Sequence, residues 1–220
     1  MTGLNHVQPG GAPLLVRLSP SVTMTKISVG PMDNNAYLLQ SAGGMSVLID
    51  AANDSGRLRK LIGEESLDTI VTTHRHGDHW QGLAAVADAT GARLFAGRPD
   101  VDAITEGAGV HGLIGVWDGD QIELGPESLA VIGLVGHTPG SITLAYTGGG
   151  RAHLFTGDSL FPGGPGRTTN PRDFTSLMDD LEAKIFEQFD DEAVVHPGHG
   201  DDTTLGRERP HLEEWRQRGW

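Results

Sequence analysis

Cysteine is absent from this chain of 220 residues. Without it the protein can form no disulfide bond and can use no thiolate nucleophile. Positive charge is also scarce, because 16 lysine and arginine residues stand against 29 aspartate and glutamate residues, for a net charge of −13. So acidic a chain is poorly suited to bind a phosphate backbone, and we predict that nucleic acid is not its main substrate.

Long apolar runs are missing as well. No stretch approaches the ~18 apolar residues of a membrane span, and the N-terminus lacks the features of a signal peptide. We therefore expect a cytoplasmic protein with no membrane partner. No linker or repeat divides the sequence, so residues 1–220 are predicted to form one domain, with the Gly- and Pro-rich residues 1–13 as a loose leader. The sequence does not indicate an oligomeric state.

What the chain does contain is a dense group of potential metal ligands. From Thr73 to His79 the sequence reads Thr-His-Arg-His-Gly-Asp-His, with three histidines and one aspartate within six residues. Neutral imidazole and carboxylate are the ligands that divalent transition metals favour, and two imidazoles one residue apart can converge on a single ion. Asp78 and His79 follow too closely to join the tetrahedron of that ion, so they suggest a second ion beside it.

More potential ligands follow at the ends of predicted strands. The β-branched run 69–73 reads as a buried strand before the motif, and the Ala-rich segment 81–91 after it reads as a helix. Three later apolar runs, 129–135, 152–156 and 192–195, are followed by His137, by Asp158 and by the pair His196 and His199. Strand ends are where α/β proteins place their sites. Four such ends with a histidine or aspartate point to one shared site.

These residues resemble the motifs of the metallo-β-lactamase-fold hydrolase superfamily, and most of all its glyoxalase II-type (hydroxyacylglutathione hydrolase-like) branch. The resemblance covers nearly the whole chain, from the strands around Tyr37 and 48–50 to His199. It implies an α/β fold of four layers, an αββα sandwich with two sheets between outer helices. Helices predicted at 55–62, 173–186 and 207–218 are consistent with those outer layers.

The resemblance also implies a dinuclear metal centre. Its first ion would be held by His74, His76 and His137, its second by Asp78, His79 and His199, and Asp158 would bridge both. His196 competes with His199, which is favoured because it follows the Pro-Gly turn as in the family. Asp50 matches a structural aspartate of the family and is expected to organise a loop. Zinc is the expected metal, with iron and manganese as alternatives.

Such a centre predicts hydrolysis of a small molecule. Two ions about 3.5–4 Å apart can share a hydroxide that is nucleophilic near neutral pH. Asp78 could orient that hydroxide, which makes it the candidate catalytic residue. The expected substrate is a thioester or another small acyl ester. A lactonase is one alternative, and a persulfide dioxygenase with one iron, bound by His74 or His76, by His137 and by Asp158, is another. A non-catalytic metal-binding or docking module is disfavoured by the complete ligand set.

Two departures from the family concern the substrate. Only 21 residues follow His199 in the 220-residue chain, so we expect it to lack the helical domain with which typical glyoxalase II enzymes contact glutathione. The loop 161–168 resembles the Gly-Arg-Thr loop of short glyoxalase II-like proteins and persulfide dioxygenases. Its Arg167 either pairs with a substrate carboxylate or ties the loop down through backbone carbonyls. Common zinc β-lactamases have cysteine at the position of Asp158, so β-lactam hydrolysis is not expected. The remaining histidines, His6, His111, His153 and His211, are expected outside the site.

Overall fold

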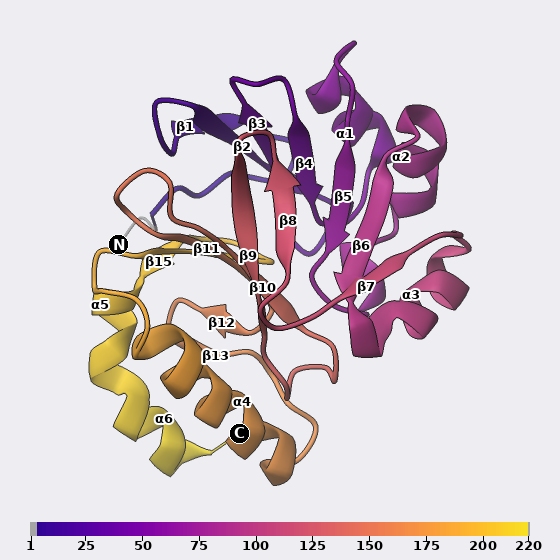
Figure 1. The fold of residues 1–220 in the computed structure, drawn as a ribbon. Coiled ribbons are helices and arrows are strands. Elements are labelled where there is room, and N and C mark those ends of the chain that lie inside the picture. Colours follow the sequence, from indigo (N-terminus) through magenta and orange to yellow (C-terminus); the bar gives the residue numbers. More distant parts are fainter. Residues whose placement is uncertain (1–3, 220) are drawn as a thin grey trace.

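Two β-sheets form the centre of the fold, with helices on the outer side of each (Figure 1). The structure is a computed structural model that describes residues 4–219. Within these residues the first sheet has seven strands in the order β1-β2-β3-β4-β5-β6-β7, and the second has six in the order β15-β14-β11-β10-β9-β8. The first sheet is antiparallel from β1 to β4 and parallel from β4 to β7.

Each sheet is built from one part of the chain: the first from β1 to β7, and the second from β8 to β15 without β12 and β13. Those of the first sheet are β1 (Leu14–Arg17), β2 (Val22–Val29), β3 (Asn34–Ser41), β4 (Ser46–Ile49), β5 (Thr69–Thr72), β6 (Arg93–Gly97) and β7 (Ile114–Val116). Those of the second sheet are β8 (Gln121–Leu124), β9 (Glu127–Gly133), β10 (Ile142–Tyr146), β11 (His153–Gly157), β14 (Val194–Pro197) and β15 (Thr203–Thr204). A separate two-stranded hairpin joins β12 (Leu160–Phe161) to β13 (Gly164–Pro165).

The helices form the outer layers. They are α1 (Ser55–Ile62), α2 (Leu83–Thr90), α3 (Val101–Ala108), α4 (Pro171–Asp180), α5 (Leu205–Glu208) and α6 (Leu212–Arg218). Helices α1 to α3 cover the first sheet, and α4 to α6 cover the second (Figure 1). Short 3₁₀ turns lie at Gly77–His79, Arg98–Asp100 and Arg209–His211.

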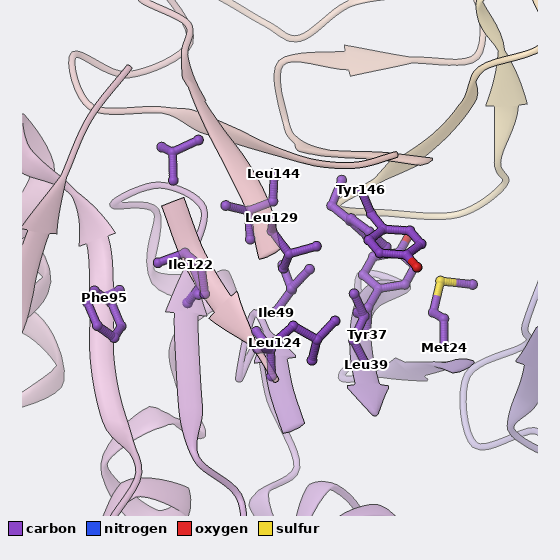
Figure 2. Packing of buried hydrophobic residues seen from close by; sticks show 14 of the residues in the cluster. Met24, Tyr37, Leu39, Ile49, Phe95, Ile122, Leu124, Leu129, Leu144 and Tyr146 are labelled. Atoms are coloured by element: carbon purple, nitrogen blue, oxygen red, sulfur yellow. The ribbon is translucent and has the colours of Figure 1, made fainter. Parts of the chain in front are cut away.

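The core has three apolar layers because both faces of each sheet are covered. Successive side chains of a strand point to opposite faces. Leu48 and Ile70 therefore pack among the helices α1 to α3, whereas Ile49 and Val71 pack between the two sheets. Figure 2 shows this middle layer, where side chains of both sheets interdigitate. The four-layer αββα sandwich predicted from the sequence is confirmed.

Helix boundaries differ from the predictions at the C-terminal end. The helix predicted over 173–186 is α4, which begins at Pro171 and passes into a π turn at Leu181–Phe186. The single helix predicted over 207–218 is wrong, because the structure divides this segment into α5, a 3₁₀ turn and α6. Pro210 lies in the turn, and a proline has no N–H to continue the helical ladder. Trp215 packs inward as expected, with 2% of its surface exposed.

Part of the predicted leader packs against the domain. Leu4 forms a β-bridge with Asp202, and the side chain of Val7 is buried. The prediction of a loose leader over 1–13 is therefore corrected for residues 4–7, whereas residues 1–3 lie outside the described residues. Between residues 4 and 219, no helix has both the length and the apolar character needed to cross a bilayer. The cytoplasmic location stays a prediction.

Candidate metal centre

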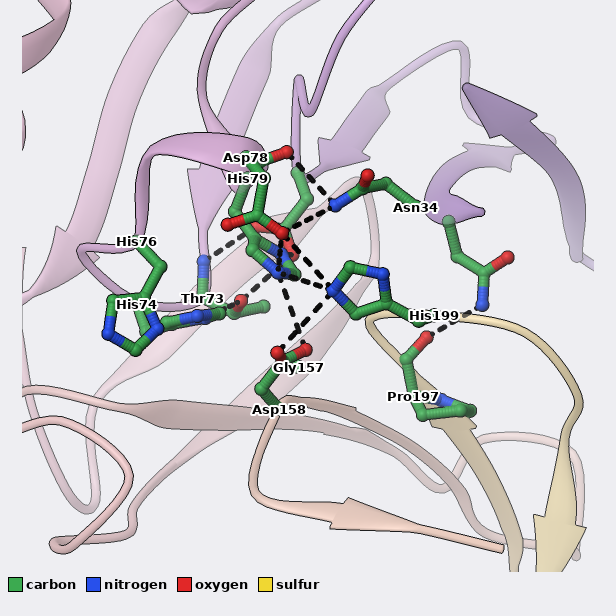
Figure 3. A network of polar contacts seen from close by, with 12 residues as sticks. Asn34, Thr73, His74, His76, Asp78, His79, Gly157, Asp158, Pro197 and His199 are labelled. Atoms are coloured by element: carbon green, nitrogen blue, oxygen red, sulfur yellow. Dashed lines mark hydrogen bonds and ion pairs between the residues drawn. The ribbon is translucent and has the colours of Figure 1, made fainter. Parts of the chain in front are cut away.

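The candidate site lies where strand ends of both sheets meet. The loop after β5 carries the histidine-rich motif, and the Gly77–His79 turn bends the chain so that Asp78 and His79 face inward. The second sheet contributes His137 from the β9–β10 loop, Asp158 from the end of β11 and His199 from the end of β14. Figure 3 shows Asp78, His79, Asp158 and His199 converging on one point.

All seven predicted ligand residues come together in three overlapping groups. Within each group the potential ligand atoms lie within 4.8 Å of one another; the groups are His74, His76 and His137, then His74, His79 and Asp158, and finally Asp78, His79 and His199. His196 belongs to none of these groups. The structure thus brings together the seven side chains that the resemblance implies as ligands, and their role as ligands stays a prediction.

The carboxylate of Asp158 lies between the groups. Its Oδ1 is 3.3 Å from His79 Nε2, and its Oδ2 is 3.7 Å from His137 Nε2 and 3.4 Å from His199 Nε2. On the far side, Asp78 Oδ2 is 3.4 Å from His79 Nε2 and 3.2 Å from His199 Nε2. The carboxylate of Asp158 thus faces histidines of all three groups.

Several buried atoms of the site have no hydrogen-bond partner among the described residues. They include His74 Nε2 and Asp158 Oδ1. An unmatched buried polar atom costs roughly 1–3 kcal/mol, so such atoms call for a ligand. Ring nitrogens also face one another, with 2.9 Å between His76 Nδ1 and His137 Nε2 and 3.2 Å between His79 Nε2 and His199 Nε2. Facing lone pairs repel unless a cation or proton lies between them, so this donor set fits divalent metal ions.

Neighbouring oxygen atoms fix which ring nitrogens face the centre. Nδ1–H of His79 donates to Asp50 Oδ2 at 2.8 Å, that of His137 to Arg167 O at 2.7 Å, and that of His199 to Met32 O at 2.9 Å. Each bond leaves Nε2 as the free lone pair. Asp50 also accepts from the backbone N–H and the hydroxyl of Thr73, at 2.7 and 2.8 Å. It thereby organises the motif loop, the role predicted for it.

Burial and charge divide the histidines into two sets. Burial lowers the pKa of His74, His76 and His137, so these rings are neutral near pH 7. Burial also opposes the charged form of His79, but the charges of Asp50 and Asp158 outweigh it and raise the pKa of His79 to about 10. For His199, burial is outweighed by hydrogen bonds to Asp158 and Asp78, which raise its pKa to about 10.

The carboxylates of the site stay ionised for the complementary reason. Burial raises the pKa of Asp78, but hydrogen bonds from His199 and Asn34 and the charge of His79 outweigh it and hold the pKa below its ordinary value. Burial likewise raises the pKa of Asp158, and the charge of His79 and the hydrogen bond from His199 bring it well below the usual range. Both side chains therefore present negative oxygens to the centre.

Two positioning residues escaped the sequence analysis. Asn34 is buried, and its Nδ2 donates to Asp78 Oδ2 at 2.9 Å and to Asp78 O at 3.1 Å. Asp100 is buried too and accepts from the backbone N–H groups of Arg75 and Gly140, both at 3.0 Å, which ties the motif loop to the loop of His137. The Asn34-Asn35 pair at the start of a strand is a usable signal, because asparagine is depleted in strands.

Glycines let the loops approach the carboxylate of Asp158. A Cβ at Gly198 would overlap Asp158 Oδ1 and lie 2.5 Å from His79 Cε1, and a Cβ at Gly166 would overlap Asp158 O. The Pro-Gly turn before His199 is thus needed for packing as well as for direction.

The other histidines lie outside the three groups, as expected. His111 and His211 are exposed, and His153 is a packed strand residue whose Nδ1 is 3.0 Å from His196 Nε2. His6 forms ion pairs with Asp201 and Asp33.

A cavity of about 260 Å³ lies along the loop that follows β11, and its lining includes none of the seven ligand residues. It is lined by the 161–167 loop and by Arg218 of α6. The Phe161 ring lies 6.3 Å from the ring of His199, and the carbonyl of Arg167 accepts from His137. Within residues 4–219 the guanidinium of Arg167 makes no hydrogen bond or ion pair, so the tie to backbone carbonyls that the sequence allowed is not found there.

Comparison with protein families agrees with this geometry. The model of the "Metallo-beta-lactamase superfamily" matches residues 29–199, a range that contains all seven residues of the three groups. The chain belongs to this superfamily. The resemblance stated from the sequence is thereby confirmed, and divalent metal ions are the cofactors that the superfamily implies.

Relatives within the superfamily include hydroxyacylglutathione hydrolases. That of Anaeromyxobacter dehalogenans is 34% identical over 175 residues, which are 76% of this chain and 61% of that protein. Across the first such relatives the chain spans 51–61% of their length. A Mycobacterium leprae protein named only as uncharacterized is 32% identical over 218 residues, covering 86% of this chain and 98% of the relative.

Solved structures of the superfamily share the fold. A di-iron-bound form of TTHA1623 is 28% identical with a TM-score of 0.71, over 84% of this chain and 96% of that one. ETHE1 from Myxococcus xanthus is 25% identical with a TM-score of 0.73, over 88% of this chain and 84% of that one.

Proposed function

We propose that the protein is a dinuclear metal-dependent hydrolase of a small thioester or another small acyl ester. The observation that carries this proposal is the position of Asp158, whose two carboxylate oxygens face different histidines, Oδ1 toward His79 and Oδ2 toward His137 and His199. A single ion would use one face of this carboxylate and leave Asp78 and His199 without a role.

The proposed ligand set follows the three groups. The first ion is assigned to His74, His76 and His137, the second to Asp78, His79 and His199, and Asp158 bridges both. Zinc is proposed as the metal, with iron as the alternative that the di-iron-bound relative supports. When bound, the two ions would supply an activated water and polarise the carbonyl of the substrate.

Asp78 is proposed as the catalytic residue. Its carboxylate is ionised, and Asn34 holds Oδ2 in place at 2.9 Å. An ionised oxygen in this position accepts a hydrogen bond from the attacking water and orients it toward the substrate carbonyl. Asn34 thus acts through Asp78 and is a positioning residue.

Arg167 is proposed to bind the substrate. Its backbone carbonyl fixes His137, and its exposed side chain, which has no partner in the described chain, belongs to the lining of the cavity along the 161–167 loop. A guanidinium pairs well with a carboxylate, so a thioester whose thiol portion bears a carboxylate fits this cavity. The names of the hydroxyacylglutathione hydrolases support a thioester. Because the chain spans only part of their length, we propose only a thioester bond and a thiol portion that bears a carboxylate.

A persulfide dioxygenase with one iron is the second candidate, because the likeness to ETHE1 fits it. It would use His137, Asp158 and one of the first two motif histidines. It gives no role to the cluster of Asp78, His79 and His199.

The two candidates are separated by one set of assays. Thiol release from a panel of thioesters and oxygen consumption with a low-molecular-weight persulfide would be measured on the same preparation. We expect thioester hydrolysis, reduced by at least about 100-fold in Asp78→Asn, and no oxygen consumption. The dioxygenase would replace the hydrolase if the parent protein hydrolysed no thioester and oxygen consumption persisted in Asp78→Asn.

A further inference from the structure

We propose that Lys26 is a positioning residue for the second metal ion, because its buried ion pair with Asp202 holds the loop that carries His199. Lys26 would thereby set how tightly the second ion binds relative to the first, and so whether the centre holds two ions or one. This inference rests on the ligand set assigned above.

Lys26 lies on β2, where neither the motif nor the family resemblance drew attention to it. Its side chain is completely buried, and Nζ donates to Asp202 Oδ1 at 2.7 Å and to Gly200 O at 2.8 Å. The side chain of Asp202 is equally buried. Moving two charges out of water is so costly that a buried ion pair often stabilises a fold no more than apolar residues would. A role in fixing geometry is the better explanation for such a pair.

The ion pair joins the two sheets at the loop of His199. Lys26 belongs to the first sheet, whereas Asp202 lies between β14 and β15 of the second. Asp202 Oδ2 is held in turn by His196 Nδ1 at 2.8 Å and by Asn5 Nδ2 at 3.0 Å. The ring of His196 stacks on Phe155 with 4.9 Å between centroids. Asp202 is therefore fixed within the second sheet, and Lys26 connects it to the first.

Side chains of the first sheet fix the peptide groups on both sides of His199. On one side, Pro197 O accepts from Tyr37 Oη at 2.7 Å and from Asn35 Nδ2 at 2.9 Å. On the other side, Gly200 O accepts from Lys26 and, at 3.1 Å, from Asn35. Figure 3 shows Pro197 and His199 on this loop. The direction of the His199 ring thus depends on contacts from β2 and β3.

The second ion is the one that this connection would affect. Its other ligands, Asp78 and His79, lie on a loop of the first sheet, so their distance from His199 depends on how the sheets are joined. The loop of His137, which belongs to the first ion, is held separately through Gly140 and Asp100. Removal of the Lys26–Asp202 pair is therefore expected to weaken one metal site and spare the other.

The test is a stepwise Zn²⁺ titration of the metal-free 220-residue chain, monitored by calorimetry. Lys26→Met and Asp202→Asn each break the pair, and the double variant removes both charges so that neither is left buried and unpaired. We expect the affinity for the second ion to fall about 10–100-fold in all three variants. The dissociation constant of the first ion should change less than threefold. Tyr146→Phe is the matched control, since it removes a buried hydrogen bond to Ser19 at the opposite end of the strands and should change neither constant.

The outcomes separate this inference from the function proposed above. Uptake of only one ion by the parent protein contradicts the dinuclear centre, and the role of Lys26 falls with it. Two ions in the parent protein and unchanged second-ion affinity in the variants overturn the role of Lys26 alone. Equal weakening of both constants also overturns it, because that indicates general loss of structure. If a single variant loses its native circular dichroism, the titration of the double variant decides.

Discussion

Two groups of histidine and aspartate lie near the end of β14, and their polar atoms are matched in different ways. In the interior chain formed by His153, His196, Asp202 and Lys26, neighbours hydrogen-bond at 2.7–3.0 Å. In the metal centre, His74 Nε2 and Asp158 Oδ1 have no hydrogen-bond partner among the described residues. The same residue types thus form a structural network in one place and a candidate cation site in the other. Buried polar atoms without a hydrogen-bond partner distinguish the two, rather than richness in histidine.

Removal of the bridging carboxylate should have the largest effect on the centre. In Asp158→Ala, we expect both ions to be lost and hydrolysis to fall at least about 10²–10³-fold, with the fold retained, because the carboxylate alone faces both sets of histidines. Metal content by elemental analysis, with circular dichroism for the fold, measures this. Asp201→Ala is the control on the adjacent loop, and it should keep both ions. Full turnover in Asp158→Ala would refute the site assignment.

Replacing His199 or His196 with alanine compares the metal centre with the interior chain directly. His199→Ala should reduce metal binding from two ions to one and weaken second-ion binding by about 10–100-fold. His196→Ala should still bind two ions at saturating Zn²⁺ and should lower the free energy of unfolding by about 2–4 kcal/mol, because Asp202 loses a buried partner and Phe155 loses its stacking contact. Metal stoichiometry and urea unfolding distinguish the two. The assignment of the groups would be reversed if His196→Ala lost an ion and His199→Ala kept both.

A pH series should separate the first ion from the second. The carboxylates of the centre raise the pKa of His79 and of His199 without metal, so this facing pair must release a proton before it can bind an ion. The histidines of the first ion have lowered pKa values and are already neutral. Between pH 7 and 8 we expect second-ion affinity to rise about tenfold or more, and first-ion affinity to change little. Zn²⁺ titration at each pH measures both constants, and equal slopes would contradict this division.

The smallest effect is expected at the edge of the cavity. Arg167→Gln removes the charge but keeps the backbone carbonyl that holds His137, so KM for a carboxylate-bearing thioester should rise about threefold to tenfold while kcat stays near that of the parent protein. Arg172→Gln, at the exposed start of α4, is the matched control. If KM rises equally for a neutral thioester, Arg167 does not bind the carboxylate of the substrate.

The sequence predicted the parts of the fold and site that depend on local patterns. The strand before the motif and the glycine that ends α2 follow from residue types within a few positions of one another, whereas the ligand set was implied by the family resemblance. Asp50 was identified because it matches a structural aspartate of the family, and in the structure it follows β4, which pairs with β5.

The positioning residues could not be predicted in this way, because their partners are distant in the chain. Lys26 follows Val22 and Met24 on the face of β2 that packs between the sheets, where a charged side chain is not expected. It is buried because Asp202 lies against it, 176 residues away. Asn34 reaches Asp78 across 44 residues. Such contacts depend on which strands become neighbours and on how the two sheets stack, which strand patterns do not encode.

The metal content of the protein tests the central claim most directly. Elemental analysis would be made on protein purified without added metal and again after dialysis against Zn²⁺ and removal of the excess. The account predicts about two equivalents of zinc, iron or manganese per chain. A single tightly held iron, with no second ion taken up on dialysis, would contradict the dinuclear hydrolase and favour the dioxygenase.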